Sequence, residues 1–194
     1  MALSYCTDLT VAEQRQLLVI ARSSICTGPG DYEAGGPDVD GLTPALREKR
    51  AVFVTLTQSA RLRGCIGTIE PVAALASAVA DSAHSAAYRD PRFPEMRIGE
   101  LEKTAIEISV LTAKEPLAAS NRKALLAELR PGVDGLLLED GRHRSTFLPK
   151  VWEQLPDVQE FLGQLLAKAG LPADHWSPSL RLHRYQAVTF GDDS

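Results

Sequence analysis

The sequence predicts an α+β domain in which a mainly antiparallel sheet is packed with helices. Two pairs of β-rich segments are each joined by a short polar turn, as in antiparallel hairpins: residues 51–57 with 62–69, and residues 135–139 with 142–148. Amphipathic helical segments lie between the pairs. The chain has 194 residues, 44% of them hydrophobic, which suits one globular domain. We therefore expect residues 1–194 to form a single domain.

The helices are predicted from capping signals and apolar periodicity. The first is expected from about Thr10 to Thr27, because Thr10 and Glu13 have the spacing of a capping box. A second follows Pro71 and carries an apolar stripe: Val72, Leu75, Ala76, Val79, Ala83 and Ala86. Shorter helical segments are expected at residues 44–49, 121–130, 150–155 and 157–169.

The strands are predicted from alternation and from turn signals. Residues 58–61 connect the first hairpin, and Asp140-Gly141 is a strong two-residue turn signal for the second. Residues 104–112 alternate as a strand does, and residues 180–190 alternate over their whole length. We expect the last segment to be one continuous strand.

Composition excludes several classes of function. The formal net charge is −4, so the basic excess of a sequence-independent nucleic-acid binder is absent. The three cysteines, Cys6, Cys26 and Cys65, form no close-spaced framework, which is typical of a reducing, cytoplasmic protein. No apolar run is long enough to span a bilayer, and the first residues lack the pattern of a secretory signal. We find no Walker, dinucleotide-binding or metal-ligand motif, so the cofactor is unknown and no metal site is expected.

The segment most suggestive of chemistry is Leu62–Thr68 (LRGCIGT), a strand that contains two glycines. With regular alternation Arg63, Cys65 and Gly67 share one face, and a cation beside Cys65 favours its thiolate, which is the nucleophile and the metal ligand. Gly64 and Gly67 would leave open space around the sulfur. The alternative is a cysteine packed as a small apolar residue, with glycines required by a bulge or a crossing helix.

The hexapeptide Leu62–Gly67 resembles the signature of the AMMECR family, and Asp90–Pro94 (DPRFP) resembles the family's short Arg-Phe-Pro-Pro loop, with Glu95 in place of the second proline. Further similar positions are Phe53–Thr55, Ser109–Leu111, Gly135-Leu136, Leu148-Pro149 and Lys168–Gly170. The resemblance implies a two-lobed α+β domain with a cleft beside the signature strand. It also implies Memo-like and radical-SAM proteins as partners, but no particular activity.

Together these observations give a set of candidate site residues. Cys65 is the candidate nucleophile, and His84 is the weak candidate for its base. The candidate binding residues are Arg63, Gly64, Gly67, Thr68, Asp90, Arg92 and Phe93. Arg63 and Asp90 are expected to pair, locking the loop to the strand. Other cations near the expected cleft, Arg61, Arg89, Arg142, Arg144 and Lys150, either bind an anion or are ordinary surface charges.

The remaining histidines, His143, His175 and His183, are further candidates for this base, although a lone histidine is more often a surface or structural residue. We expect His143 to be solvated, and Trp152 and Trp176 to anchor the core or a lobe interface.

Two functions remain open. In the first, the protein is an enzyme, or a component of an enzyme system, that acts on a small anionic substrate through the cleft at Cys65. In the second, it is a non-enzymatic binding or scaffold protein for partner proteins. The sequence leaves open whether the protein is an enzyme.

Overall fold

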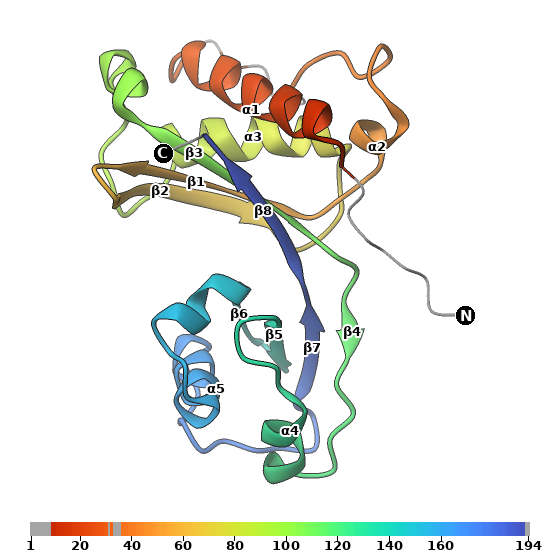
Figure 1. Cartoon of the computed structure of the whole chain (residues 1–194). Coiled ribbons are helices and arrows are strands. Elements are labelled where there is room, and N and C mark those ends of the chain that lie inside the picture. Colours follow the sequence, from red (N-terminus) through yellow and green to blue (C-terminus); the bar gives the residue numbers. More distant parts are fainter. Residues whose placement is uncertain (1–8, 31, 33–35, 193–194) are drawn as a thin grey trace. The chain divides into compact units, whose positions relative to one another are not determined.

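The structure is a computed structural model, and it describes residues 9–30, 32 and 36–192. These residues form two compact units (Figure 1). The first unit contains the residues up to Leu111 together with those from Val188 onward, and the second contains Thr112–Ala187. Each unit has its own four-stranded antiparallel sheet and its own hydrophobic core. The predicted α+β class is confirmed.

In the first unit, two long helices cover one face of the sheet (Figure 1). The strand order is β2-β1-β3-β8, so β2 is an edge strand. The strands are β1 (Val52–Gln58), β2 (Arg61–Thr68), β3 (Ala105–Leu111) and β8 (Ala187–Gly191). The helices are α1 (Val11–Cys26), α2 (Pro44–Arg47) and α3 (Leu75–Tyr88), with a 3-10 helix, η1, at Ile98–Lys103.

The core of this unit lies between α3 and the sheet. Val52, Val54 and Leu56 alternate along β1 and are fully buried beneath the helix. At the start of α1 the Thr10 hydroxyl accepts the Glu13 N–H, and the Glu13 carboxylate accepts the Thr10 N–H, so the predicted capping box is present. Val72 lies before α3 and is exposed, so its place in the apolar stripe was wrong.

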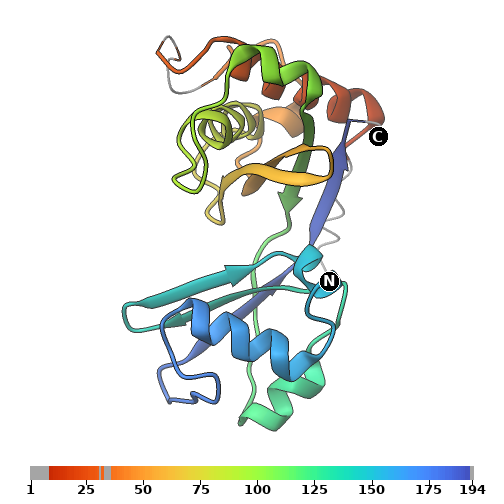
Figure 2. The same cartoon turned by 90° about the vertical axis from the view of Figure 1, so that its left-hand side faces the viewer.

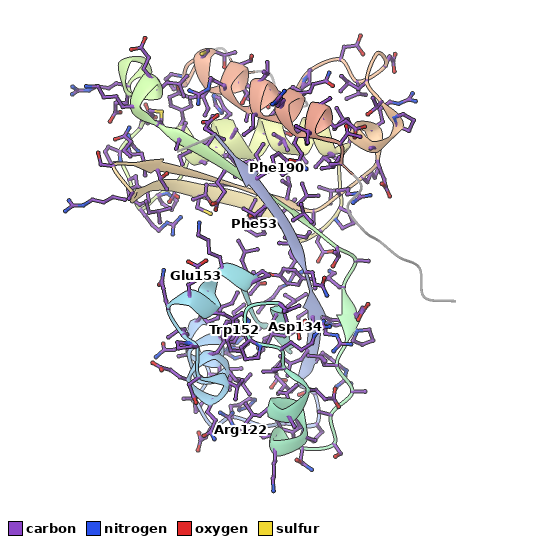
Figure 3. All side chains as sticks on the ribbon, viewed as in Figure 1. Phe53, Arg122, Asp134, Trp152, Glu153 and Phe190 are labelled. Atoms are coloured by element: carbon purple, nitrogen blue, oxygen red, sulfur yellow. The ribbon has the colours of Figure 1, made fainter. Side chains whose placement is uncertain are left out.

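The second unit packs helices on a sheet of order β4-β7-β5-β6 (Figure 2). Its elements are β4 (Glu115–Pro116), α4 (Arg122–Glu128), β5 (Gly135–Asp140), β6 (His143–Phe147), the 3-10 helix η2 (Pro149–Glu153), α5 (Val158–Lys168) and β7 (Arg181–Tyr185). Trp152 is buried, as expected. Its ring stacks on Phe161 with centroids 3.7 Å apart, and its indole N–H donates to the Asp134 carbonyl at 2.7 Å (Figure 3).

The last β-rich segment is not one strand. It divides into β7, in the sheet of the second unit, and β8, in the sheet of the first. The break is at Gln186, whose backbone N–H donates to the Thr112 hydroxyl and whose carbonyl accepts the Thr112 N–H, each at 2.9 Å. Because alternation continues across the break, the sequence alone does not reveal it.

The second hairpin turns one residue later than predicted. Asp140 pairs with His143 as the last residue of β5, and Gly141, with φ of 59°, begins the turn. The reason is the Asp140 carboxylate, which accepts hydrogen bonds from Ser177, Ser179 and His175 and is thereby fixed on the strand.

Among the described residues, no helix has both the length and the apolar composition required to cross a bilayer.

The first hairpin has a turn that suits glycine but lacks it. Ser59 and Ala60 connect β1 and β2 with φ of 47° and 61°, and a left-handed residue with a side chain costs roughly 1–2 kcal/mol. We predict that Ala60→Gly raises the free energy of unfolding by about 0.5–1 kcal/mol in urea titrations followed by circular dichroism. Ala12→Gly, the same change on an exposed position in α1, should lower it. Equal effects of the two changes would contradict this account of the turn.

Candidate functional site

Gly64 is required by a helix that crosses β2 in close contact. A Cβ on Gly64 would lie 2.0 Å from the carbonyl oxygen of Ala86 in α3, which no side chain tolerates. The strand is also irregular here, since Leu56 pairs with Gly64 but Thr57 pairs with Leu62. Arg63 is therefore the extra residue of a β-bulge. The bulge and the crossing helix together explain this glycine.

Cys65 lies on the opposite face of the sheet from α3. It pairs with Thr55, whose neighbours Val54 and Leu56 are buried beneath the helix. The Thr55 hydroxyl donates a hydrogen bond to the Cys65 sulfur at 3.3 Å, and Cys65 is half-buried. This hydroxyl is the sulfur's neighbour that sequence analysis did not single out, because only strand register brings it there.

The second glycine lies beneath an aromatic ring. A Cβ on Gly67 would be 2.2 Å from the Val52 carbonyl oxygen and 2.6 Å from Cγ of Phe53, the residue opposite it on β1. The expectation that Gly64 and Gly67 leave open space around the sulfur is therefore wrong, since protein atoms occupy the space at both. The glycines shape the strand, and they do so by admitting a helix on one face and Phe53 on the other.

The loop after α3 closes the edge of β2 at Cys65. The Cys65 N–H donates to Oδ2 of Asp90 at 2.9 Å, and Nη2 of Arg92 donates to the Cys65 carbonyl at 3.1 Å. A neighbouring strand would satisfy the same two backbone groups, and on an edge strand they would otherwise face water. Two side chains thus satisfy both backbone groups of Cys65.

Asp90 and Arg92 form a two-point ion pair. Nε donates to Oδ1 at 2.9 Å and Nη2 donates to Oδ2 at 2.6 Å, while the Arg92 backbone N–H also donates to Oδ1. The Asp90 side chain is 1% exposed and that of Arg92 is 53% exposed. The Arg92 guanidinium, followed by the Cys65 N–H, holds the pKa of Asp90 well below its ordinary value. The pKa of Arg92 is raised, chiefly by Asp90 and also by Cys65. The Phe93 ring supports the guanidinium, whose carbon is 5.5 Å from the ring centroid.

Arg63 forms its ion pair with a carboxylate other than Asp90. Its Nη2 donates to Glu100 of η1 at 3.3 Å, so the predicted pair with Asp90 is wrong. The bulge breaks the alternation that was expected to place Arg63 beside Cys65, and Arg92 is the cation that contacts Cys65 instead. Thr68 ends the strand by accepting the Glu70 N–H at 3.0 Å.

The structure does not bring His84 to Cys65. His84 is fully buried on α3, its Nε2 bonds the Gly28 carbonyl at 2.9 Å, and its ring stacks on Tyr32. It thus packs toward α1, on the other side of the sheet from the sulfur.

The remaining histidines belong to the second unit and have partners within it. Nδ1 of His143 bonds the Ala169 carbonyl at the end of α5, so His143 is not simply solvated. His175 bonds Asp140, and His183 lies 3.9 Å from Glu139. In the part of the chain that the structure describes, no group of three or more His, Cys, Asp or Glu side chains is arranged to hold a metal ion.

The buried carboxylate predicts a pH-dependent contribution to stability. Because the folded-state pKa of Asp90 is lowered from 3.8, its contribution is present above that value and is lost as the pH falls through the folded-state pKa. We predict that Asp90→Asn lowers the free energy of unfolding by about 2 kcal/mol at neutral pH, since the ion pair is lost. Urea titrations at several pH values should show the difference shrinking below pH 3.8.

Asp40→Asn is the matched control, because Asp40 is an exposed aspartate of the same unit. It should change stability little at any pH. A pH-independent difference between Asp90→Asn and the unmodified protein would contradict the role given to the carboxylate.

Comparison with known proteins shows the family to which the chain belongs. The AMMECR1 family model matches residues 18–190. A protein of Methanothermobacter thermautotrophicus is 41% identical over 186 residues, covering 93% of this chain and 95% of the relative. A protein of Thermofilum pendens is 43% identical over 159 residues, covering 76% of this chain and 75% of the relative. The crystal structure of an uncharacterised protein from Pyrococcus horikoshii superposes with a TM-score of 0.83 at 31% identity, covering 92% of this chain and 90% of that one. The chain belongs to the AMMECR1 family.

Proposed function

We propose that this AMMECR1-family protein is an enzyme, or a component of an enzyme system, that acts on a small anionic substrate through the Cys65 thiol. The proposal is carried by one observation. The half-buried Cys65 sulfur accepts a hydrogen bond from Thr55, and the cation Arg92 bonds the carbonyl of the same residue. A hydroxyl donor and a nearby guanidinium both stabilise a thiolate, which is the reactive form of cysteine.

Arg92 is the residue proposed to contact the anionic group of the substrate. Its Nε and Nη2 are used by Asp90 and Cys65, whereas Nη1 has no hydrogen-bond partner among the described residues. Asp90 holds the guanidinium in a fixed orientation from a buried position, so Arg92 need not be ordered when a ligand binds. The cleft implied by the family resemblance is part of this proposal.

The proposed chemistry is a displacement at carbon. The Cys65 thiol loses its proton to water, and the thiolate electron pair forms a carbon–sulfur bond with the substrate. The bond between that carbon and its leaving group breaks, and the leaving group departs with the bonding pair. The reducing cytoplasm, where we place the protein, keeps such a thiol available.

A second candidate is a binding or scaffold protein for partners such as Memo-like and radical-SAM proteins. It is favoured by a specific observation: both arginines of the signature segment and loop are already paired with carboxylates, Arg63 with Glu100 and Arg92 with Asp90. In addition, His84, the histidine considered as a base for Cys65, bonds the Gly28 carbonyl instead.

The test is alkylation of Cys65 by two reagents of equal size, anionic iodoacetate and neutral iodoacetamide, with Cys6 and Cys26 changed to serine. We expect the ratio of the iodoacetate rate to the iodoacetamide rate to exceed that of glutathione at the same pH by about tenfold, because Arg92 attracts the anion. Arg92→Gln should reduce this ratio, and Thr55→Val should slow both reagents because the sulfur loses its donor. Rates are read by intact-protein mass spectrometry.

Arg89→Gln is the control, because Arg89 is an exposed arginine of the same loop without a hydrogen bond to Cys65. It should leave both rates unchanged. If Arg92→Gln leaves the ratio unchanged, the anionic substrate is wrong. If Cys65 reacts only after unfolding, the thiol function is wrong, and binding of a purified Memo-like protein should then survive Cys65→Ala.

A further inference from the structure

The second unit contains a pocket whose lining residues all belong to that unit. Its volume is about 360 Å³, which suits a small organic molecule. The walls come from two segments, residues 116–120, which begin at the end of β4, and residues 176–183, which continue into β7. They are joined where the Leu117 N–H donates to the Leu182 carbonyl at 2.8 Å. Leu125 of α4 adds an apolar surface.

The lining combines an aromatic ring with a cation. Trp176 lines the pocket and is 39% exposed, although we expected it to be an anchor in the core or at a lobe interface. Pro178 and Leu180 add further apolar surface. A partly exposed indole that lines a pocket offers a stacking surface for a flat ring.

Arg181 contributes a positive charge that has no carboxylate partner among the described residues of the second unit. Its Nη1 donates to the carbonyls of Pro178 and Leu180, which fixes the direction of the guanidinium. Its Nε and Nη2 have no partner among the described residues, and these two donors are the edge that binds a carboxylate side-on. The nearby Glu139, opposite Arg181 in register, is used by Arg144 at 3.1 Å.

The segment that carries Trp176 is held in place before any ligand arrives. Ser177 and Ser179, on either side of Pro178, donate to the Asp140 carboxylate at 2.7 and 2.5 Å, and His175 bonds the same group. These donors, Ser179 first, lower the pKa of Asp140 to about 2. Asp140 therefore remains an acceptor at neutral pH, and the pocket wall needs little ordering on binding.

From this pocket, its ring and its unpaired guanidinium, we propose a binding site for a small aromatic carboxylate, with the ring against Trp176 and the carboxylate on Arg181. The site is independent of the function proposed for Cys65.

The experiment titrates the full chain with benzoate and follows tryptophan fluorescence excited at the red edge. The chain has two tryptophans, and Trp152 is 4% exposed and stacked on Phe161, so a ligand-dependent change reports Trp176. We expect a saturable change with benzoate and about tenfold weaker binding of benzamide, its neutral analogue of equal shape. Arg181→Gln should weaken benzoate binding by about tenfold. Arg181→Lys keeps the charge but loses the paired donors of the guanidinium, so it should weaken benzoate binding by less.

Trp176→Phe should abolish the signal, and Arg142→Gln should leave benzoate binding unchanged, because Arg142 is an exposed arginine of the β5–β6 turn outside the pocket. The emission of Trp152 shows that each variant is folded. No saturation with benzoate, equal binding of benzoate and benzamide, or an unchanged affinity in Arg181→Gln would each overturn the site.

Discussion

The architecture around Cys65 depends on the contact between α3 and β2 at Gly64. The Ala86 carbonyl of the helix occupies the place of a side chain at residue 64, so helix and strand approach to backbone contact. Four residues later the chain leaves α3 and reaches Asp90, whose carboxylate accepts the N–H of the next strand residue, Cys65. A larger residue at position 64 would push the helix away and move Asp90 with it. This one steric constraint thus fixes both the packing of α3 on β2 and the position of Asp90 beside Cys65.

Charge is distributed differently in the two units. Near Cys65, Arg92 and Arg63 are each paired with a carboxylate. Each pair is neutral as a whole, so these arginines contribute oriented hydrogen-bond donors rather than a net positive charge. An ion pair of this kind holds hydrogen-bond donors in a fixed orientation. In the second unit the Arg181 guanidinium is held by two backbone carbonyls, and it has no carboxylate partner among the described residues. The first arrangement suits a positioned reactive group, and the second suits capture of an anion.

Much of the fold was predictable because its signals are local. The Thr10 capping box, the Gln58–Arg61 connection and most helix boundaries depend on residues within one turn of each other. The signature strand and the loop at Asp90 and Arg92 were likewise singled out from short motifs, and the structure brings them together. Thr55, although it lies in one of the family-like segments, and Glu100 were not assigned to the site, because they reach it only through strand register and through the path of η1.

By itself the sequence determined the α+β class, the capped helices, the hairpins and the segment that contains Cys65, since these follow from propensity, periodicity and turn chemistry over a few residues. Tertiary structure alone decided three other features. It divided the segment that contains Gln186 between two sheets, turned His84 toward α1, and paired Arg63 with Glu100 rather than Asp90. These outcomes depend on a bulge, on a helix crossing and on partners distant in the chain. The alternation of apolar and polar residues in the sequence is the same whichever of these arrangements forms. Only tertiary packing therefore selects between them.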